Sequence, residues 1–340
     1  MLDESLQLSP RISVAPVLHG SGDFAVEVRR IQLAHEFDCL AVPLPPSFQT
    51  SVEQAIDHLP NVTAVVQEER PSFSTNDWTP DSDQDDEDTD AKRRASYVPV
   101  DPCQPVIAAL RVAIQERTPR AFIDLETDHF ESHSIILPDP YALKRVSIER
   151  FAAAALLGIP RPPEGLPTDR IRTMVARLKE LETRYKKILF VCALSDWPWI
   201  REAYTQNLRT EEEDTDVEDA QLCSVAPNSL LFMLGELPFL TGLYEQARAE
   251  LDSDENLSVD GLKQLLLASR DRYQVEMRSL ARRITPKLMS VFLRYVRNLS
   301  LIERRITPDL YTLIVAARQV FGDSFAIELA EVSRSYPYVS

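Results

Sequence analysis

The residue whose type and position most strongly suggest chemistry is His19, which ends a short apolar run. The segment from Ile12 to Asp23 reads ISVAPVLHGSGD, a pattern that predicts a strand, a glycine turn and the start of a helix. An imidazole beside Gly20 and Gly22 can bind a metal or accept a proton, whereas a lone histidine is also common as a structural residue. The turn lacks the GxGxxG spacing and the lysine of a Walker loop, so a nucleotide-phosphate site is not predicted.

A second group of candidate ligands follows the apolar run AFIDL. It comprises Asp124, Glu126, Asp128, His129 and His133. The three acids alternate along the chain, so in an extended segment they share one face, and their oxygen atoms suit a hard divalent cation. The alternative interpretation is a polar strand exit that holds no ligand.

Asp196 follows the most strand-like run in the chain, KILFVCAL at residues 187–194. The near-continuous apolarity of this run predicts a central parallel strand that is covered on both faces. Because ligands of open α/β sheets bind at the carboxyl ends of the strands, we expect Asp196 to converge on His19. We therefore assign His19 and Asp196 as candidate catalytic residues, and His19, Asp124 and Glu126 as candidate ligands of a divalent metal. The serine before Asp196 is not in a GxSxG motif, which argues against a serine nucleophile.

The elements that must position these side chains alternate between strands and helices. Further strands are predicted at 39–42, 62–66, 121–125 and 222–225. This alternation implies right-handed βαβ units. We predict an α/β domain over residues 1–226, built on a mostly parallel sheet with flanking helices, and an all-helical domain over 227–340.

Within the helical part, two segments begin alike, RRITPKL at Arg282 and RRITPDL at Arg304. In each, threonine is expected to cap a helix whose first residue is proline. The buried stripe of the first helix is predicted to be Leu288, Val291, Phe292, Tyr295, Val296 and Leu299. The surrounding stretch, residues 263–318, holds 12 Lys and Arg against 4 Asp and Glu. We interpret it as a solvated face, with a nucleic-acid surface or a surface that receives the chain's own acidic segments as alternatives.

The net charge of −16 comes from two segments of the 340-residue chain. Residues 77–90 contain eight carboxylates and residues 211–219 contain seven, out of 53 Asp and Glu against 37 Lys and Arg, so the remainder is nearly neutral. The absence of apolar periodicity predicts disordered insertions at about 70–96 and 210–220. The first of these could occupy a basic groove, although a solvated loop is the simpler interpretation.

No apolar run approaches the roughly 18 residues of a membrane span, and the N-terminus resembles no signal peptide. We therefore expect a soluble, cytoplasmic protein without membrane association. The four cysteines lie far apart, which predicts buried reduced thiols rather than disulfides or a zinc site. The C-terminal sequence SRSYPYVS has no clear helix stop, so we expect that the chain could be the front portion of a longer protein.

Three stretches together resemble the superfamily that includes erythromycin-esterase-like, ChaN-like and TraB/TIKI proteins. These are LHGSGDFAVEVRRI, FDCLAVPLPPS, and DRIRTMVARLKEL followed by KKILFVCALSD, and the likeness covers roughly residues 10–205. The resemblance implies an α/β core with a site of histidines and acids, and in some members a metal-dependent hydrolase. His19 corresponds to the family histidine, and Arg172 and Met174 correspond to its helix. Pro43 stands where the family has a glutamate, and Ser195 or Asp196 where it has a histidine.

Two functions follow from these observations. The first is a divergent member of this superfamily, a hydrolase of unassigned substrate that uses a divalent metal. The second is a catalytically inactive module whose helical domain and acidic segments bind a protein partner. Nucleic acid is the least favoured partner, and the substrate and the oligomeric state are not indicated by the sequence.

Overall fold

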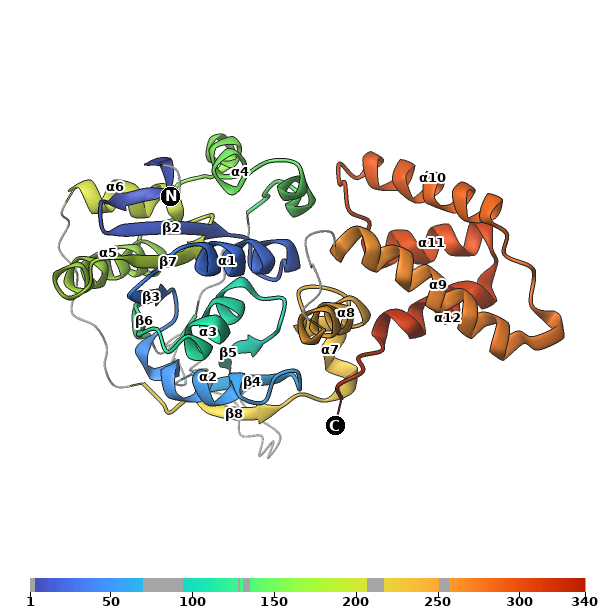
Figure 1. Ribbon diagram of the computed structural model, residues 1–340, viewed down its shortest axis with the longest axis horizontal. Helices are drawn as coiled ribbons and strands as arrows, with labels where there is room; N and C mark the ends of the chain where they lie inside the picture. Colours follow the sequence, from blue (N-terminus) through green and yellow to red (C-terminus); the bar gives the residue numbers. More distant parts are fainter. Residues whose placement is uncertain are drawn as a thin grey trace, which may run out of the picture.

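The computed structural model describes residues 4–69, 94–127, 129–130, 135–206, 217–250 and 257–339. Figure 1 shows an α/β part and, beside it, a group of helices formed by the C-terminal third of the chain. Most of the two acidic segments for which we predicted disorder, at about 70–96 and 210–220, lies outside the described residues. The first prediction extends too far, because Ala95 and Ser96 belong to a strand.

The larger sheet has five strands in the order β1-β2-β7-β3-β6. Their bounds are β1 Gln7–Ser9, β2 Ile12–Val17, β7 Ile188–Ala193, β3 Cys39–Val42 and β6 Arg120–Phe122. The pairs β2–β7, β7–β3 and β3–β6 are parallel, and only β1 is antiparallel to its neighbour. The apolar run that forms β7 lies between β2 and β3 and is buried along almost its whole length, as predicted for a central strand.

A second sheet, of three strands, is antiparallel throughout. It consists of β5 Ala95–Val100, β4 Thr63–Glu68 and β8 Gln221–Ser224, in that order. Three of the six pairings among the described strands are therefore antiparallel, and the predicted mostly parallel sheet is wrong for the molecule as a whole. The physical reason is that β4 pairs antiparallel with β5 and β8 and does not join the parallel strands of the larger sheet. The coarser prediction of a mixed α/β fold with helices is confirmed.

Six of the described α-helices pack around the two sheets. They are α1 Gly22–Ala34, α2 Gln49–Ile56, α3 Pro105–Gln115, α4 Ile148–Ala155, α5 Leu166–Arg184 and α6 Trp197–Gln206. Helix α1 packs on α3, α5 packs on α6, and α3 also contacts β3 and β7 (Figure 1). Short 3-10 helices cover Glu4–Leu6, Pro46–Phe48 (η2), Pro140–Lys144 (η3), Leu156–Gly158, Pro227–Ser229 and Arg278–Leu280. One apolar cluster, from Leu6 to Ala203, joins these elements.

Helices α9 to α12 form a second apolar cluster. Their bounds are α9 Leu257–Met277, α10 Pro286–Ile302, α11 Leu310–Val320 and α12 Asp323–Arg334. Thr285 caps α10 as predicted, since its side chain accepts a hydrogen bond from the Leu288 N–H. The corresponding prediction for the second RRITP segment is wrong, because Asp309 caps α11 and the helix starts at Leu310.

Helix α10 packs on α11 and buries a narrower stripe than its sequence indicates. Phe292 and Val296 are buried, but Val291 and Tyr295 are 46% and 36% exposed. An amphipathic pattern predicts that all apolar residues on one side of the helix are buried. In the structure, only those that face a neighbouring helix are buried. Apolar side chains of α10 consequently remain in contact with solvent.

The segment between the two clusters belongs structurally to both. Helix α7 (Leu230–Met233) and α8 (Pro238–Ala249) follow β8, and buried Leu230 and Tyr244 pack against residues of the α/β part. Tyr336, which follows α12, returns to the same place and donates its hydroxyl to the Pro60 carbonyl at 2.5 Å. Among the described helices, none combines the length and apolarity required to cross a bilayer. All four cysteines are free thiols, and three of them are buried as predicted, whereas Cys223 is only half-buried.

Candidate functional site

Parallel pairing brings two of the predicted residues to one edge of the larger sheet. In the β2–β7 ladder Val17 lies opposite Ala193, so the strands end side by side. His19 follows β2 by two residues and Asp196 follows β7 by three. Asp124 follows β6 by two residues and lies at the same carboxyl edge. Strand topology alone therefore places these three side chains in one region of the molecule.

His19 is exposed and held by one amide side chain. Its Nδ1 lies 3.2 Å from Gln104 Oε1, and the same oxygen accepts the Gly20 N–H at 3.2 Å. Because an amide oxygen only accepts, the hydrogen bond places the proton on Nδ1 and leaves the Nε2 lone pair available. Surrounding protein desolvates the imidazolium and lowers the pKa of His19, although Gln104 and Asp196 act in the opposite direction. The ring is therefore mainly neutral at pH 7, as a general base must be.

Arg170, from the second turn of α5, occupies the centre of the site. Its Nε lies 3.1 Å from both oxygens of Asp124, and its Nη2 lies 2.5 Å from Oδ2. Arg177, two turns further along α5, donates to the Asp124 carbonyl. The Asp124 side chain is 4% exposed and that of Arg170 is 18% exposed. The guanidinium also stacks on the Phe130 ring, 5.0 Å from its centroid.

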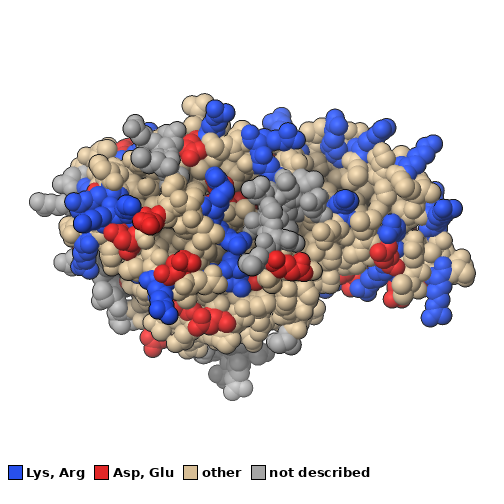
Figure 2. Space-filling model, viewed as in Figure 1, with Lys and Arg blue, Asp and Glu red and all other residues tan. Residues whose placement is uncertain are grey.

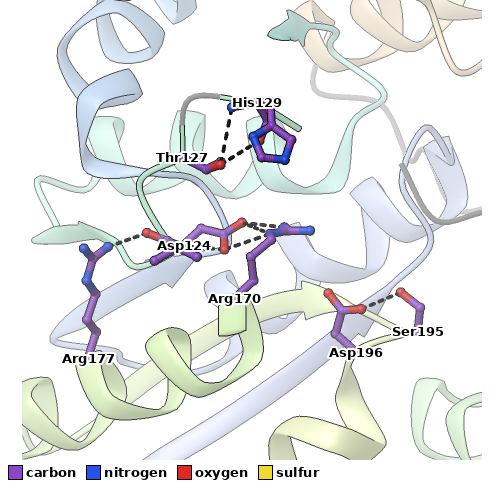
Figure 3. A network of polar contacts seen from close by, with 8 residues as sticks. Asp124, Thr127, His129, Arg170, Arg177, Ser195 and Asp196 are labelled. Atoms are coloured by element: carbon purple, nitrogen blue, oxygen red, sulfur yellow. Dashed lines mark hydrogen bonds and ion pairs between the residues drawn. The ribbon is translucent and has the colours of Figure 1, made fainter. Parts of the chain in front are cut away.

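Asp196 lies on the other side of the guanidinium, as Figure 3 shows. Ser195 donates its hydroxyl to the Asp196 carboxylate at 2.9 Å. Burial raises the pKa of Asp196, and the charges of Arg170 and His19 oppose this rise. Burial lowers the pKa of Arg170, but the carboxylates of Asp124 and Asp196 outweigh it, so the net change is upward. His19, Asp196, Arg170 and Asp124 thus interact electrostatically as one group.

The predicted metal ligands are not arranged as a metal site. Both oxygens of Asp124 face Arg170, and Glu126 is turned toward η2, where its Oε1 accepts the Ser47 N–H at 2.7 Å. Within the described ranges, no group of three His, Cys, Asp or Glu side chains could hold a metal ion. A divalent cation at Asp124 would have to displace a guanidinium that already neutralises it. The donor set therefore does not fit a metal.

Two further predicted ligands, Asp128 and His133, lie outside the described residues. His129 is exposed, and its backbone carbonyl accepts the Thr127 hydroxyl at 2.7 Å (Figure 3).

The glycine turn after His19 contacts protein rather than open space. Gly20 has φ +71°, and its Cα would lie 2.2 Å from a Cβ added to Gly235 in the loop before α8. The Gly22 N–H donates to Glu236 Oε1 at 3.1 Å. We expected these backbone groups to meet a ligand, but the amide of Gly20 is bonded to Gln104 and that of Gly22 to Glu236.

The same junction contains two acids with raised pKa values. Asp101 accepts the N–H groups of Cys103 and Gly235, both at 2.8 Å, and it does not cap α3, which begins at Pro105. Burial raises the pKa of Asp101 to about 6. Burial, together with neighbouring carboxylates, raises the pKa of Glu236 to about 7.

Two residues of the site were not identified from the sequence, Arg170 and Gln104. The arginine that we singled out on this helix, Arg172, bonds Asp169 one turn earlier and does not contact Asp124. A helical projection would have distinguished the two, because Arg170 is four residues before Met174, which is completely buried. An arginine on the buried face of a helix requires a partner acid. This position in the helix could have identified Arg170 as a residue of the site.

The site therefore combines an accessible imidazole, a carboxylate of raised pKa and a guanidinium at the carboxyl ends of the parallel strands of the larger sheet. Comparison with protein-family models, with curated proteins and with solved structures found no match to this chain.

Proposed function

We propose that the chain is a hydrolase whose active site is the carboxyl edge of the larger sheet, acting on an ester or related acyl bond. The observation that carries the proposal is that His19 and Asp196 follow the ends of two adjacent parallel strands and that Arg170 of α5 interacts with Asp196 there. The resemblance to erythromycin-esterase-like proteins supports the same reaction class. Because the carboxylates present do not fit a metal, the proposed chemistry uses only side chains of this chain.

His19 acts as the general base. Gln104 fixes the tautomer, so that Nε2 accepts a proton from a water molecule whose oxygen attacks the acyl carbon. The proton then passes from the imidazolium to the leaving alkoxide when the acyl–oxygen bond breaks. Atoms and charge balance in this sequence, and no additional reactant besides water is needed.

Arg170 stabilises the oxyanion that forms on the acyl oxygen. Two of its nitrogens, Nε and Nη2, donate to Asp124, while Nη1 has no acceptor among the residues that the structure describes. Donors fixed in advance by an ion pair stabilise developing charge without reorganisation, and one such donor contributes about 3 kcal/mol in well-studied enzymes. Asp196 favours the imidazolium by its charge.

A second candidate function is a catalytically inactive interaction module. The specific observation in its favour is the Asp124–Arg170 pair, in which the guanidinium is already neutralised and Arg177 also bonds the aspartate carbonyl. An ion pair of this kind also holds α5 against the strand ends, which is a purely structural role. Pro43, at the position of the family glutamate, agrees with this alternative.

The test is esterase activity of the full chain on a panel of p-nitrophenyl and aryl esters. We expect His19→Gln to lower kcat/KM at least about 100-fold. His58→Gln, at an exposed histidine in the turn after α2, is the matched control and should retain full activity. Activity that is insensitive to His19→Gln would refute the proposed site, and absence of activity from the whole panel would favour the inactive module.

Metal dependence is measured on the same samples. Elemental analysis of wild type and His19→Ala after incubation with Zn²⁺ or Mn²⁺ should give no bound metal that depends on His19. Stoichiometric metal lost only in the variant would instead restore the metal-dependent mechanism.

A further inference from the structure

A cavity of about 920 Å³ lies between α9 and α10, away from His19. The α9 wall consists of the face that carries Leu262, Leu266 and Arg270, and the α10 wall of the face that carries Met289 and Leu293. Positions three, four and seven residues apart form each wall, as expected for two helices whose sides face a common space.

One end of the cavity is closed by the α/β part. Tyr141 of η3 lines the cavity together with the Ile306–Pro308 loop. Asp139, the N-cap of η3, holds that loop in place, since it accepts the N–H groups of Ile306 and Thr307 at 2.9 and 2.8 Å. The cavity is thus bounded by elements of both parts of the molecule and is not a gap left by a frayed helix.

Its lining is apolar at the base and cationic at the rim. Leucine, isoleucine and methionine side chains form most of the base, while Lys263, Arg270, Arg294 and Arg297 also line it. No aspartate or glutamate is among the lining residues that the structure describes. Figure 2 shows Lys and Arg side chains along the outer edges of the helical part.

Three of these cations are available to a ligand. Arg270 is paired with Asp271 at 2.7 Å. In contrast, Lys263, Arg294 and Arg297 are exposed and form no ion pair with any described carboxylate. An apolar cavity whose free charges are all positive is complementary to a molecule with an apolar body and an anionic head.

The size of the cavity favours a small molecule over a helix. Sites for small ligands are typically about 300–1,000 Å³, a range that includes this cavity. The lining on α10 extends from Pro286 to Arg297, about 16 Å along the helix axis. A partner helix of that length, about 10 Å across, has a larger volume than the cavity contains.

We propose that this cavity binds a small anionic amphiphile, a long-chain carboxylate whose apolar chain lies between α9 and α10. Its carboxylate contacts Arg294 and Arg297, which are one turn apart on α10, and Lys263 on the opposite wall. Because this site is distinct from the carboxyl edge of the sheet, it does not depend on the proposed hydrolase activity.

The proposal is tested by calorimetric titration of the full chain with laurate, kept below its micelle concentration. Dodecanol and dodecylammonium are the neutral and cationic probes with the same chain length. We expect laurate to bind with one-to-one stoichiometry, and dodecanol and dodecylammonium to bind at least about tenfold more weakly.

Variants of the cavity distinguish the contribution of the ligand's carboxylate to binding from that of its apolar chain. Arg294→Gln combined with Arg297→Gln removes two exposed charges and should weaken laurate binding about tenfold, while dodecanol binding remains unchanged. Leu293→Asp, at a 46% exposed position, should abolish laurate binding without loss of helix content. Lys287→Gln, on α10 but outside the cavity lining, is the matched control and should bind laurate within twofold of wild type.

Three results would overturn the proposal. One is a wild-type chain that does not bind laurate. Another is equal binding of laurate and dodecanol that the double arginine variant leaves unchanged. The third is binding to phosphatidylglycerol vesicles with no binding of monomeric laurate, which would make this surface a membrane contact.

Discussion

Glu236 links the stability of the fold to pH. Its carboxylate accepts the Gly22 N–H, and burial raises its pKa from 4.5 to about 7. An acid with a raised pKa binds its proton more tightly in the folded state. Stability is therefore greatest below the unfolded-state pKa and falls as the pH rises through the folded-state value. The relevant pH range runs from 4.5 to about 7.

The size of the effect follows from the shift. Each pKa unit corresponds to about 1.4 kcal/mol, so the carboxylate costs the folded state up to about 3 kcal/mol above neutral pH. Glu236 is only partly buried by surface area, and screening by solvent reduces this to about 2 kcal/mol. Glu236→Gln preserves the oxygen that accepts the Gly22 N–H but cannot ionise.

The assay is urea unfolding of wild type and Glu236→Gln at several pH values, followed by tryptophan fluorescence. We expect similar free energies of unfolding near about pH 5, and a variant that is about 2 kcal/mol more stable near about pH 8.5. Glu116→Gln, at an exposed glutamate, controls for the loss of one negative charge and should parallel wild type. Parallel curves for wild type and Glu236→Gln would refute the reasoning.

Three further predictions concern the site and its supports. Arg170→Met should lower the free energy of unfolding by about 3 kcal/mol, because Asp124 remains buried without its partner, and adding Asp124→Leu should recover most of the loss in urea unfolding. Gly235→Ala should destabilise by about 2 kcal/mol or more, since its Cβ would meet backbone at 2.2 Å, whereas Gly158→Ala, with no atom within 4 Å, should leave the melting temperature nearly unchanged. The His19 ring should titrate below pH 6.5 in proton NMR, and a midpoint above that value would contradict the neutral base that the structure indicates.

The parts of the fold that depend on local pattern were predictable. The apolar runs of β2 and β7 specify buried parallel strands, and strand polarity then places His19 and Asp196 at one edge. The sheet that contains β4 was not predictable, because its partner β8 is remote in sequence and β-branched residues suit either sheet.

Side chains that act through distant contacts were also missed. Asp101 looks like a helix cap in sequence, but it accepts an N–H from a loop 134 residues away. The role of Arg170 depends on which face of α5 meets the strand ends, a property of packing rather than of the local sequence. Apolar residues of α10 are exposed because few helices lie beside it. An amphipathic pattern does not predict how many neighbours a helix has.

The return of the C-terminal tail to the α/β part makes α9 to α12 an insertion rather than an appendage. Pro337 lies so close to Gly242 of α8 that a Cβ there would come within 2.5 Å of its ring, so the chain leaves and re-enters at one place. Truncation after residue 226 would remove the loop that covers Gly20 and Asp101. Excision of the four helices, with the end of α8 joined to Ser335, would leave those contacts intact. The contacts that such a deletion would break include those of α9 with α1 and of Asp139 with the Ile306–Pro308 loop, so the lobe is joined to the rest of the molecule by packing as well as by the backbone.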